Sequence, residues 1–301
     1  MRLDAASAAS TAIDFARQFV DAPLDKQKGG ADKAQPTGAD QDTPFATGSG
    51  DGNAIHPNDV RQNGYGSCAV LSSLVSIAQQ DPGAIRDMIQ DNGDGTYTVT
   101  FQEPVEILGL HLGTREVEVT VSGPFEGGAA HPSGDVNANG EQEVWPAIIE
   151  AAYAQQYHAH DPHYSTGVNP SDVMERILGV SAQSEDVSAI DIDTIESRLE
   201  DGEAVVAWTS STTDASGNSV FPTPEQQKIA DGYGVVPGHA YSVREVVRAG
   251  ETYVDPNTGQ AVTAAEDTIV LENPWGRQDA AMTFADYQTV YYQLNSAATS
   301  P

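Results

Sequence analysis

Cysteine is almost absent from this chain, which has 301 residues and a single cysteine, Cys68. One cysteine excludes an internal disulfide framework and a cysteine-rich zinc site. The sequence also lacks any run of about eighteen apolar residues, so we expect no membrane span. Residues 1–7 lack the cationic start and long apolar stretch of a secretory signal. We therefore expect a cytoplasmic protein, or one exported without a secretory signal peptide, such as a bacterial effector.

Basic residues are also scarce. The sequence has 14 Lys and Arg against 44 Asp and Glu, which gives a formal net charge of −30. Such a surface repels nucleic acid and anionic lipid, so neither is an expected partner. Cationic proteins, cationic peptides and metal cations are compatible with it. A strongly solvated surface without any such partner explains the same bias, and both interpretations stay open here.

The distribution of apolar residues divides the chain into three regions. We expect residues 1–54 to form a flexible leader with a short amphipathic helix at 5–20, because residues 21–52 contain almost nothing to bury. Residues 55–200 are predicted to form a helix-rich lobe, and residues 201–301 a β-rich lobe. This order predicts an α+β fold with a cleft between the two lobes.

Periodicity predicts the individual elements. The expected helices begin at 68 and 144 and also cover 84–89, 171–178 and 193–199. The expected strands cover 96–101, 105–112, 116–121, 204–209, 240–247, 268–271 and 290–294. A loop rich in Gly, Ala and Pro is expected at 122–142. After residue 204 the pattern therefore predicts mainly strands.

Cys68 stands where a glycine-rich turn, residues 62–67, runs into an apolar helix. Ser67 is predicted to cap that helix. A helix N-terminus stabilises negative charge, so the thiol pKa is expected to be lowered. Leu71 and Leu74 belong to a stripe at helical spacing that can bury one face. The sulfur is thus predicted to stand at the mouth of the helix, although a lone cysteine is more often a small buried hydrophobe.

A cysteine nucleophile needs a base within hydrogen-bond reach and a third group to orient that base. His239 follows a glycine turn and opens a predicted strand, which is a rigid platform for a base. Asn273 ends a later strand, where its amide can accept a hydrogen bond from the imidazole and fix the tautomer. Trp275 can shield that bond from water. The sequence therefore holds Cys, His and Asn in the order of a thiol-protease triad.

Two other segments have residue types that bind metals. One is a histidine cluster after a helix, whose tight spacing also suits a surface turn; it contains His158, His160, His163 and Asp161. The other, residues 135–140, begins like an EF-hand loop, with oxygen ligands at alternate positions and glycine sixth. Its twelfth position is Pro146 instead of a bidentate glutamate, which weakens the calcium interpretation. The sequence leaves the metal question open.

Four blocks in this order resemble the catalytic core of calpain-type, papain-like cysteine proteases; they are residues 62–74, 144–153, 238–243 and 271–276. The resemblance covers residues 55–295 and implies a papain-like fold that hydrolyses peptide bonds through a thioester. It implies Cys68 as nucleophile, His239 as base and acid, and Asn273 as orienting residue. Gln62 resembles the side chain that supplies the oxyanion hole with the Cys68 backbone N–H.

The resemblance also bears on partners and cofactors. It implies protein or peptide substrates, and the acidic composition favours cationic ones. The chemistry itself requires no cofactor. Many calpains need calcium to bring their lobes together, so calcium dependence is a further expectation.

Two positions depart from the family pattern, which has an acidic residue before the cysteine and a tryptophan after it. This chain has Ser67 and Ala69 instead. The missing tryptophan would have packed beside the active site, but no group that moves a proton is lost. Two functions follow. The first is an active thiol endopeptidase, and the second is a catalytically degenerate interaction module that binds a cationic protein partner.

Overall fold

The computed structural model of this chain describes residues 42–45, 54–107, 110–123, 125, 142–160, 164 and 167–299. The predicted helix at 5–20 and the EF-hand-like residues 135–140 lie outside the described residues. So do most of the predicted leader and most of the predicted loop at 122–142.

Helices and strands alternate along the described chain. The helices are α2 (Cys68–Gln80), α3 (Pro82–Met88), α4 (Trp145–Tyr157), α5 (Pro170–Leu178), α6 (Ile192–Glu200), α7 (Pro224–Tyr233) and α8 (Phe284–Val290), with short 3₁₀ helices η1 (Pro57–Asp59) and η2 (Val187–Ala189). The predicted helices at 68, 84–89, 144, 171–178 and 193–199 are confirmed to within a few residues as α2, α3, α4, α5 and α6.

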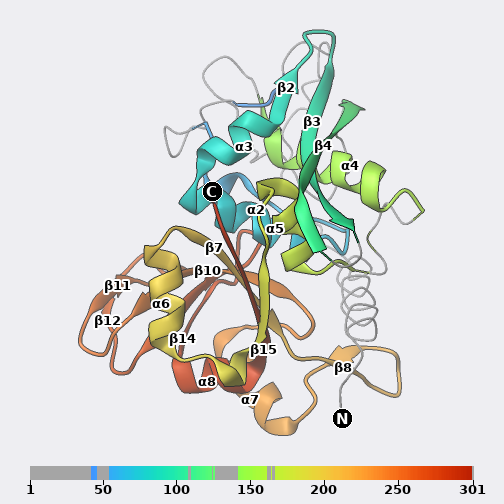
Figure 1. Ribbon diagram of the computed structural model, residues 1–301. Coiled ribbons are helices and arrows are strands. Elements are labelled where there is room, and N and C mark those ends of the chain that lie inside the picture. Colours follow the sequence, from blue (N-terminus) through green and yellow to red (C-terminus); the bar gives the residue numbers. More distant parts are fainter. Residues whose placement is uncertain are drawn as a thin grey trace, which may run out of the picture.

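The larger sheet has the strand order β14-β13-β10-β7-β15-β6, and each neighbouring pair is antiparallel. Its strands are β6 (Gln183–Asp186), β7 (Glu203–Thr209), β10 (Ala240–Val247), β13 (Thr268–Glu272), β14 (Ala280–Thr283) and β15 (Tyr291–Ala298). In Figure 1 this sheet occupies the lower half of the molecule, together with α6, α7 and α8.

A second antiparallel sheet occupies the upper half of Figure 1 and consists of β2 (Ile89–Asp91), β3 (Thr96–Ile107) and β4 (Leu110–Ser122). The remaining strands form short pairs: β1 (Asp42–Thr43) with β5 (Gln142–Glu143), β8 (Thr212–Thr213) with β9 (Ser219–Val220), and β11 (Thr252–Val254) with β12 (Ala261–Thr263). Helices and antiparallel sheets on separate parts of the chain make this an α+β fold.

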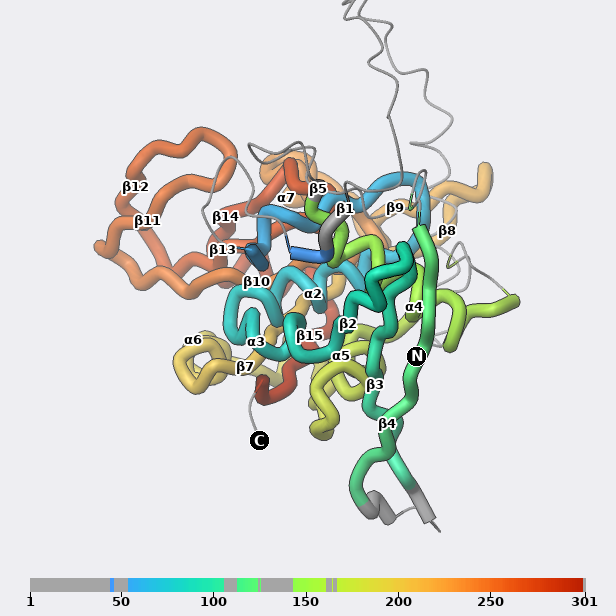
Figure 2. Tube along the Cα trace, turned by 90° about the horizontal axis from the view of Figure 1, so that it is seen from above, coloured from blue at the N-terminus to red at the C-terminus, as the bar shows by residue number. Residues whose placement is uncertain are grey.

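Helix α2 lies beside β7 and β10 of the larger sheet (Figure 2). The face toward the sheet is polar: Ser72 donates to the carbonyl oxygen of Ala240 at 2.8 Å, and Ser76 accepts from the backbone N–H of Val205 at 2.7 Å. The opposite face contributes to a hydrophobic cluster with α3, α4, α5 and the β3–β4 hairpin. Every residue from 68 to 78 is buried, so α2 is enclosed on all sides and not only along its apolar stripe.

A second hydrophobic cluster fills the space around the larger sheet. It joins buried side chains of β7, β10, β13, β14 and β15 with those of α6, α7 and α8. Ile192 and Ile195 of α6 belong to this cluster although they precede residue 201. The two-lobe division of the chain at residues 200 and 201 stays a prediction.

The β3–β4 hairpin corrects one part of the sequence analysis. The predicted strand at 105–112 is wrong, because this range contains the end of β3 and the start of β4, which pair from Thr96 opposite Ser122 to Ile107 opposite Leu110. The register shifts between Pro104 and Glu106, as in a β-bulge. The predicted strands at 96–101 and 116–121 are confirmed as parts of β3 and β4.

Helices α7 and α8 were missed in a region predicted to be mainly strands. A signal for α7 was present in the sequence: Thr223 caps the helix, Pro224 opens it, and Gln226 completes a capping box. The larger sheet, in contrast, matches the predicted strands at 204–209, 240–247 and 268–271, and β15 begins one residue after the predicted start of the strand at 290–294.

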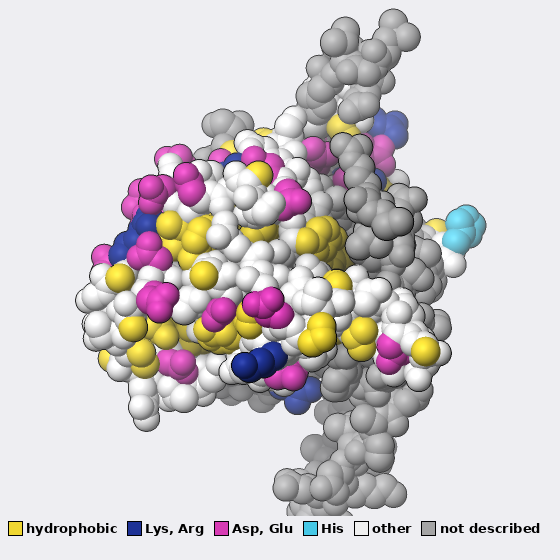
Figure 3. All heavy atoms as spheres, turned by 90° about the horizontal axis from the view of Figure 1, so that it is seen from below, with side chains coloured by type: hydrophobic (Ala, Val, Ile, Leu, Met, Phe, Trp, Pro, Cys, Tyr) yellow, Lys and Arg dark blue, Asp and Glu magenta, His cyan; other side chains and the backbone are white. Residues whose placement is uncertain are grey.

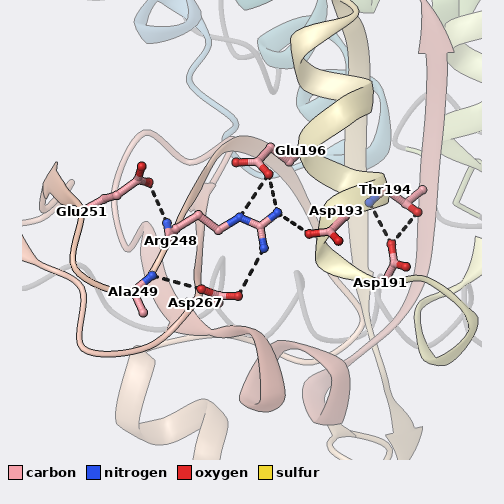
Figure 4. A network of polar contacts seen from close by, with 8 residues as sticks. All are labelled: Asp191, Asp193, Thr194, Glu196, Arg248, Ala249, Glu251 and Asp267. Atoms are coloured by element: carbon pink, nitrogen blue, oxygen red, sulfur yellow. Dashed lines mark hydrogen bonds and ion pairs between the residues drawn. The ribbon is translucent and has the colours of Figure 1, made fainter.

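Arg248 connects α6 to the loop after β10 through several carboxylates (Figure 4). Its guanidinium contacts Asp193 at 2.6 Å, Asp267 at 3.2 Å, and Glu196. Its backbone N–H donates to Glu251 at 2.9 Å. This network therefore neutralises part of a dense group of carboxylates and fixes α6 beside the sheet.

The surface reflects the acidic composition. The face seen from below in Figure 3 carries many Asp and Glu side chains and few Lys and Arg side chains. Among the described residues, no helix is long and apolar enough to cross a membrane.

Candidate active site

His239 and Asn273 form a buried pair at neighbouring ends of β10 and β13. His239 immediately precedes β10, and Asn273 immediately follows β13. Nε2 of His239 lies 3.0 Å from Oδ1 of Asn273, and the two residues are 5% and 3% exposed. Because β10 and β13 are antiparallel neighbours in the sheet, this pairing places the strand start and the strand end side by side.

The hydrogen bonds around Asn273 determine the tautomer of the imidazole. The backbone N–H of Trp275 donates to Oδ1 of Asn273 at 3.0 Å, so the atom that faces His239 is the amide oxygen. An amide oxygen only accepts, hence Nε2 of His239 must carry the proton. In the neutral ring this leaves Nδ1 with a free lone pair. The pair is therefore arranged to present Nδ1 as a base.

Side chains of neighbouring residues hold the backbone of both His239 and Asn273. The backbone N–H of His239 donates to Oγ1 of Thr209 at 2.8 Å, and that hydroxyl donates to the carbonyl oxygen of Val236 at 2.8 Å. On the other side, the backbone N–H of Asn273 donates to Oδ1 of Asp279 at 2.7 Å. Thr209 and Asp279 were not recognised from the sequence, since neither stands in a motif.

Aromatic rings surround the imidazole. The Trp275 ring centroid lies 4.7 Å from that of His239, and the Tyr241 ring meets the imidazole edge-on at 5.1 Å. The Trp275 ring therefore lies against the imidazole and its backbone N–H orients the amide, while its role as a shield stays a prediction.

Cys68 begins α2 and lies against the start of β10. It shares a small cluster with Ala240, the residue that follows His239, and hydrogen bonding to the backbone of Ala240 also acts on the sulfur. Cys68 is 4% exposed. The structure therefore brings the predicted nucleophile to the strand end that carries the predicted base.

Burial determines the protonation states of Cys68 and His239. It raises the pKa of the Cys68 thiol to about 11, against smaller opposing hydrogen bonds from the backbone of Ala240, Ala69 and Cys68. It lowers the pKa of His239 to about 4, against the opposing Asn273 hydrogen bond. The predicted lowering of the thiol pKa is thus wrong here, because desolvation outweighs the effect of the helix start. Both groups are favoured in their neutral forms.

Ser67 also differs from its predicted role. It is the residue before α2, but its side chain makes no capping hydrogen bond, and its hydroxyl has no hydrogen-bond partner among the described residues. The backbone N–H groups at the start of α2 are therefore left without this side-chain acceptor.

Gln62 packs against the turn formed by residues 273–276. Its backbone N–H donates to the carbonyl oxygen of Pro274 at 2.7 Å, and its side-chain Nε2 donates to the carbonyl oxygen of Tyr65 at 2.7 Å. Nε2 has a second N–H bond, which suits the predicted oxyanion role. Its Oε1 is buried without a hydrogen-bond partner among the described residues.

The departure at Ala69 has a visible counterpart. Ala69 is 1% exposed and belongs to the same cluster as Cys68 and Trp208. Trp208 lies on β7 directly opposite Ala240, and it is 4% exposed. A large aromatic side chain thus shares a cluster with Cys68, from the strand instead of from the helix.

The predicted metal segments contribute nothing to this site in the described part of the chain. His158 stacks its ring near Tyr153 and Tyr164, with centroids 6.0 and 5.0 Å away. His163 and Asp161 lie outside the described residues. No group of three or more His, Cys, Asp or Glu side chains among the described residues could hold a metal ion.

The strand-borne histidine and amide, with a cysteine at a helix start, have the residue types of a thiol hydrolase. Residues 51–299 match the family model described as calpain family cysteine protease. The chain belongs to this family, as the four sequence blocks predicted. Comparison with curated proteins gives no match.

Proposed function

We propose that this chain is a thiol endopeptidase whose nucleophile is Cys68, whose base and acid is His239, and whose orienting residue is Asn273. The observation that carries the proposal is the hydrogen bond of 3.0 Å between Nε2 of His239 and Oδ1 of Asn273. Together with the Trp275 N–H, it leaves Nδ1 as the basic atom next to the strand residue that contacts Cys68. Protein or peptide substrates follow from the family.

In the proposed reaction, Nδ1 of His239 takes the thiol proton while the sulfur of Cys68 attacks the peptide carbonyl carbon. The backbone N–H of Cys68, which has no helical acceptor at the first position of α2, and Nε2 of Gln62 stabilise the oxyanion. The imidazolium then protonates the leaving amine as the C–N bond breaks. Water hydrolyses the thioester with His239 as base and regenerates the thiol.

The neutral resting forms give this reaction a specific order. Because burial disfavours both the thiolate and the imidazolium, proton transfer is expected to accompany attack instead of preceding it. The proposed resting state is therefore a neutral thiol at Cys68 and a neutral imidazole at His239.

Burial of Cys68 also favours a second candidate function, an interaction module that keeps the fold without the activity. A thiol that is 4% exposed and has a raised pKa reacts slowly. The acidic surface would then serve a cationic protein partner (Figure 3).

Alkylation with iodoacetamide separates the two functions. A thiol probe reaches Cys68 before denaturation if the site is active, and only after denaturation if it is an interaction module. We expect native protein to be alkylated at Cys68 and to hydrolyse fluorescein-labelled casein. Cys68→Ala should remove both signals, and full hydrolysis by this variant would refute the assignment. Parallel reactions with calcium and with a calcium chelator test whether calcium is needed.

A further inference from the structure

Arg61, one residue before Gln62, packs its side chain against the turn formed by residues 273–276. Gly276 in this turn has a φ of +63°. A Cβ atom at this position would lie 1.9 Å from Nη1 of Arg61 and 2.5 Å from its Cζ. The arginine head group therefore rests directly on the turn backbone, in space that is open because residue 276 has no side chain.

The same turn holds a carboxylate that the arginine acts on. Asp279 is half-buried, and burial raises its pKa, while the Asn273 backbone hydrogen bond and the charges of Arg244 and Arg61 lower it. Oδ1 of Asp279 accepts the Asn273 backbone N–H at 2.7 Å. The positive charge of Arg61 thus favours the ionised form of Asp279, the carboxylate that anchors the backbone of Asn273.

Residues 61 and 62 hold the turn together. The Arg61 side chain lies against one side of the exposed Gly276, and the Gln62 backbone N–H donates to the carbonyl oxygen of Pro274 at 2.7 Å. The turn itself is closed by the Gly276 N–H, which donates to the carbonyl oxygen of Asn273 at 2.8 Å. The segment that carries the proposed oxyanion residue is therefore fastened to the segment that carries the orienting residue.

We propose that Arg61 is a positioning residue that holds Gln62 at the oxyanion position by packing residues 60–62 against the turn at Gly276, with its charge close enough to act on Asp279. This inference rests on the proposed function, since it assigns Arg61 a role in the same reaction. Asn273 has further contacts of its own with Trp275 and His239, so removal of Arg61 should affect Gln62 first.

Two reactions of the same sulfur distinguish this role from general support of the fold. Attack on p-nitrophenyl acetate passes through an oxyanion, forms the thioester and expels p-nitrophenolate with the electron pair of the broken C–O bond, while His239 takes the thiol proton. Alkylation by iodoacetamide displaces iodide and develops no oxyanion. A residue that acts through Gln62 should therefore affect acylation and spare alkylation.

The variants are Arg61→Met, Arg61→Lys, Gln62→Ala and the double variant Arg61→Met with Gln62→Ala. We expect Arg61→Met to slow acylation about tenfold and Gln62→Ala about a hundredfold, since oxyanion donors are worth that order. Alkylation should stay within twofold in each. The double variant should be no slower than Gln62→Ala alone, because the effect of Arg61 passes through Gln62. Arg61→Lys should be intermediate.

Arg115→Met is the matched control. Arg115 is 69% exposed on its side chain, pairs with Glu103 on the β3–β4 hairpin, and should change neither rate. If Arg61→Met does not fold, Arg61→Lys and the conservative Asp279→Asn decide the matter, and each should slow acylation at least threefold while sparing alkylation. Equal loss of both reactions, or acylation at the wild-type rate, overturns the positioning role. If wild-type Cys68 reacts with neither reagent, the proposed function fails and this inference with it.

Discussion

The strand-borne half of the candidate site and the helix-borne half are built differently. His239 and Asn273 are held by side-chain hydrogen bonds that fix both the amide and the ring. Cys68 is held by packing and backbone contacts. Around it, Ser67 Oγ, Gln62 Oε1 and Trp208 Nε1 are buried without hydrogen-bond partners among the described residues.

The orientation of the His239 ring and the protonation of the Cys68 thiol therefore have separate structural causes. His239, the proposed base, has one tautomer and one direction fixed by Asn273. Cys68, the proposed nucleophile, lies where burial favours the neutral thiol, so its proposed reactivity depends on the entry of a substrate. Three predictions test how far the two halves are independent.

The largest expected effect concerns the packing around the nucleophile. Trp208→Ala should lower the free energy of unfolding by about 3–5 kcal/mol, because it removes a buried aromatic side chain. As a single substitution, Ala69→Trp should also destabilise the protein, because the larger side chain overfills the cluster. Combined with Trp208→Ala, the same substitution should restore much of the loss if the two positions share one space.

Urea unfolding followed by tryptophan fluorescence and circular dichroism measures these energies. Val262→Ala on the exposed face of β12 provides the control, with an expected change near zero. Strictly additive effects of the two substitutions would show that residues 69 and 208 do not exchange volume.

The next prediction concerns the charge of His239. Its pKa is about 4 in the folded protein and 6.5 in its unperturbed form, so protonation favours the unfolded state. Stability from this group is complete above pH 6.5 and falls as the pH is lowered through 4. The loss should approach about 3 kcal/mol, at about 1.4 kcal/mol for each unit of pKa shift.

Comparison of wild type with His239→Gln isolates this contribution. Unfolding free energies at pH 7, 6, 5 and 4 should decline more steeply in wild type than in the variant. Parallel curves would mean that the pKa of His239 is the same in the folded and unfolded protein, and would contradict the lowered value.

The smallest predicted effect compares the two halves in one reaction. Asn273→Ala should slow alkylation of Cys68 about tenfold, because the imidazole loses the bond that orients it as a base. Gln62→Ala should leave alkylation within twofold. The exposed Asn92→Ala serves as control for the loss of an amide. Equal slowing by the Asn273 and Gln62 substitutions would show that the two halves are not separable.

The sequence predicted those features that depend on local pattern. His239 at a glycine turn, Asn273 at a strand end and Cys68 at a helix start all stand where the pattern indicated. Strands β7, β10 and β13 were predicted almost to their ends, because continuous apolar and β-branched runs mark buried strands.

Features that depend on tertiary contact were not predictable. The protonation of Cys68 and His239 follows from burial by β7, β10 and the α2 start, which no local window contains. Arg61 reaches Gly276 across more than 200 residues of intervening chain, at a glycine whose φ the sequence does not reveal. The cluster that contains Ala69 and Trp208 likewise joins positions on separate elements.

The polar face of α2 has a consequence for how this family member can diverge. Ser72, Ser76 and Gln79 attach the helix to backbone atoms of Ala240, Val205 and Arg244. Every amino acid supplies a backbone carbonyl, and every one except proline supplies a backbone N–H, so these contacts survive most replacements in the strands. Side chains of the sheet can therefore change while the helix that begins at Cys68 stays in place.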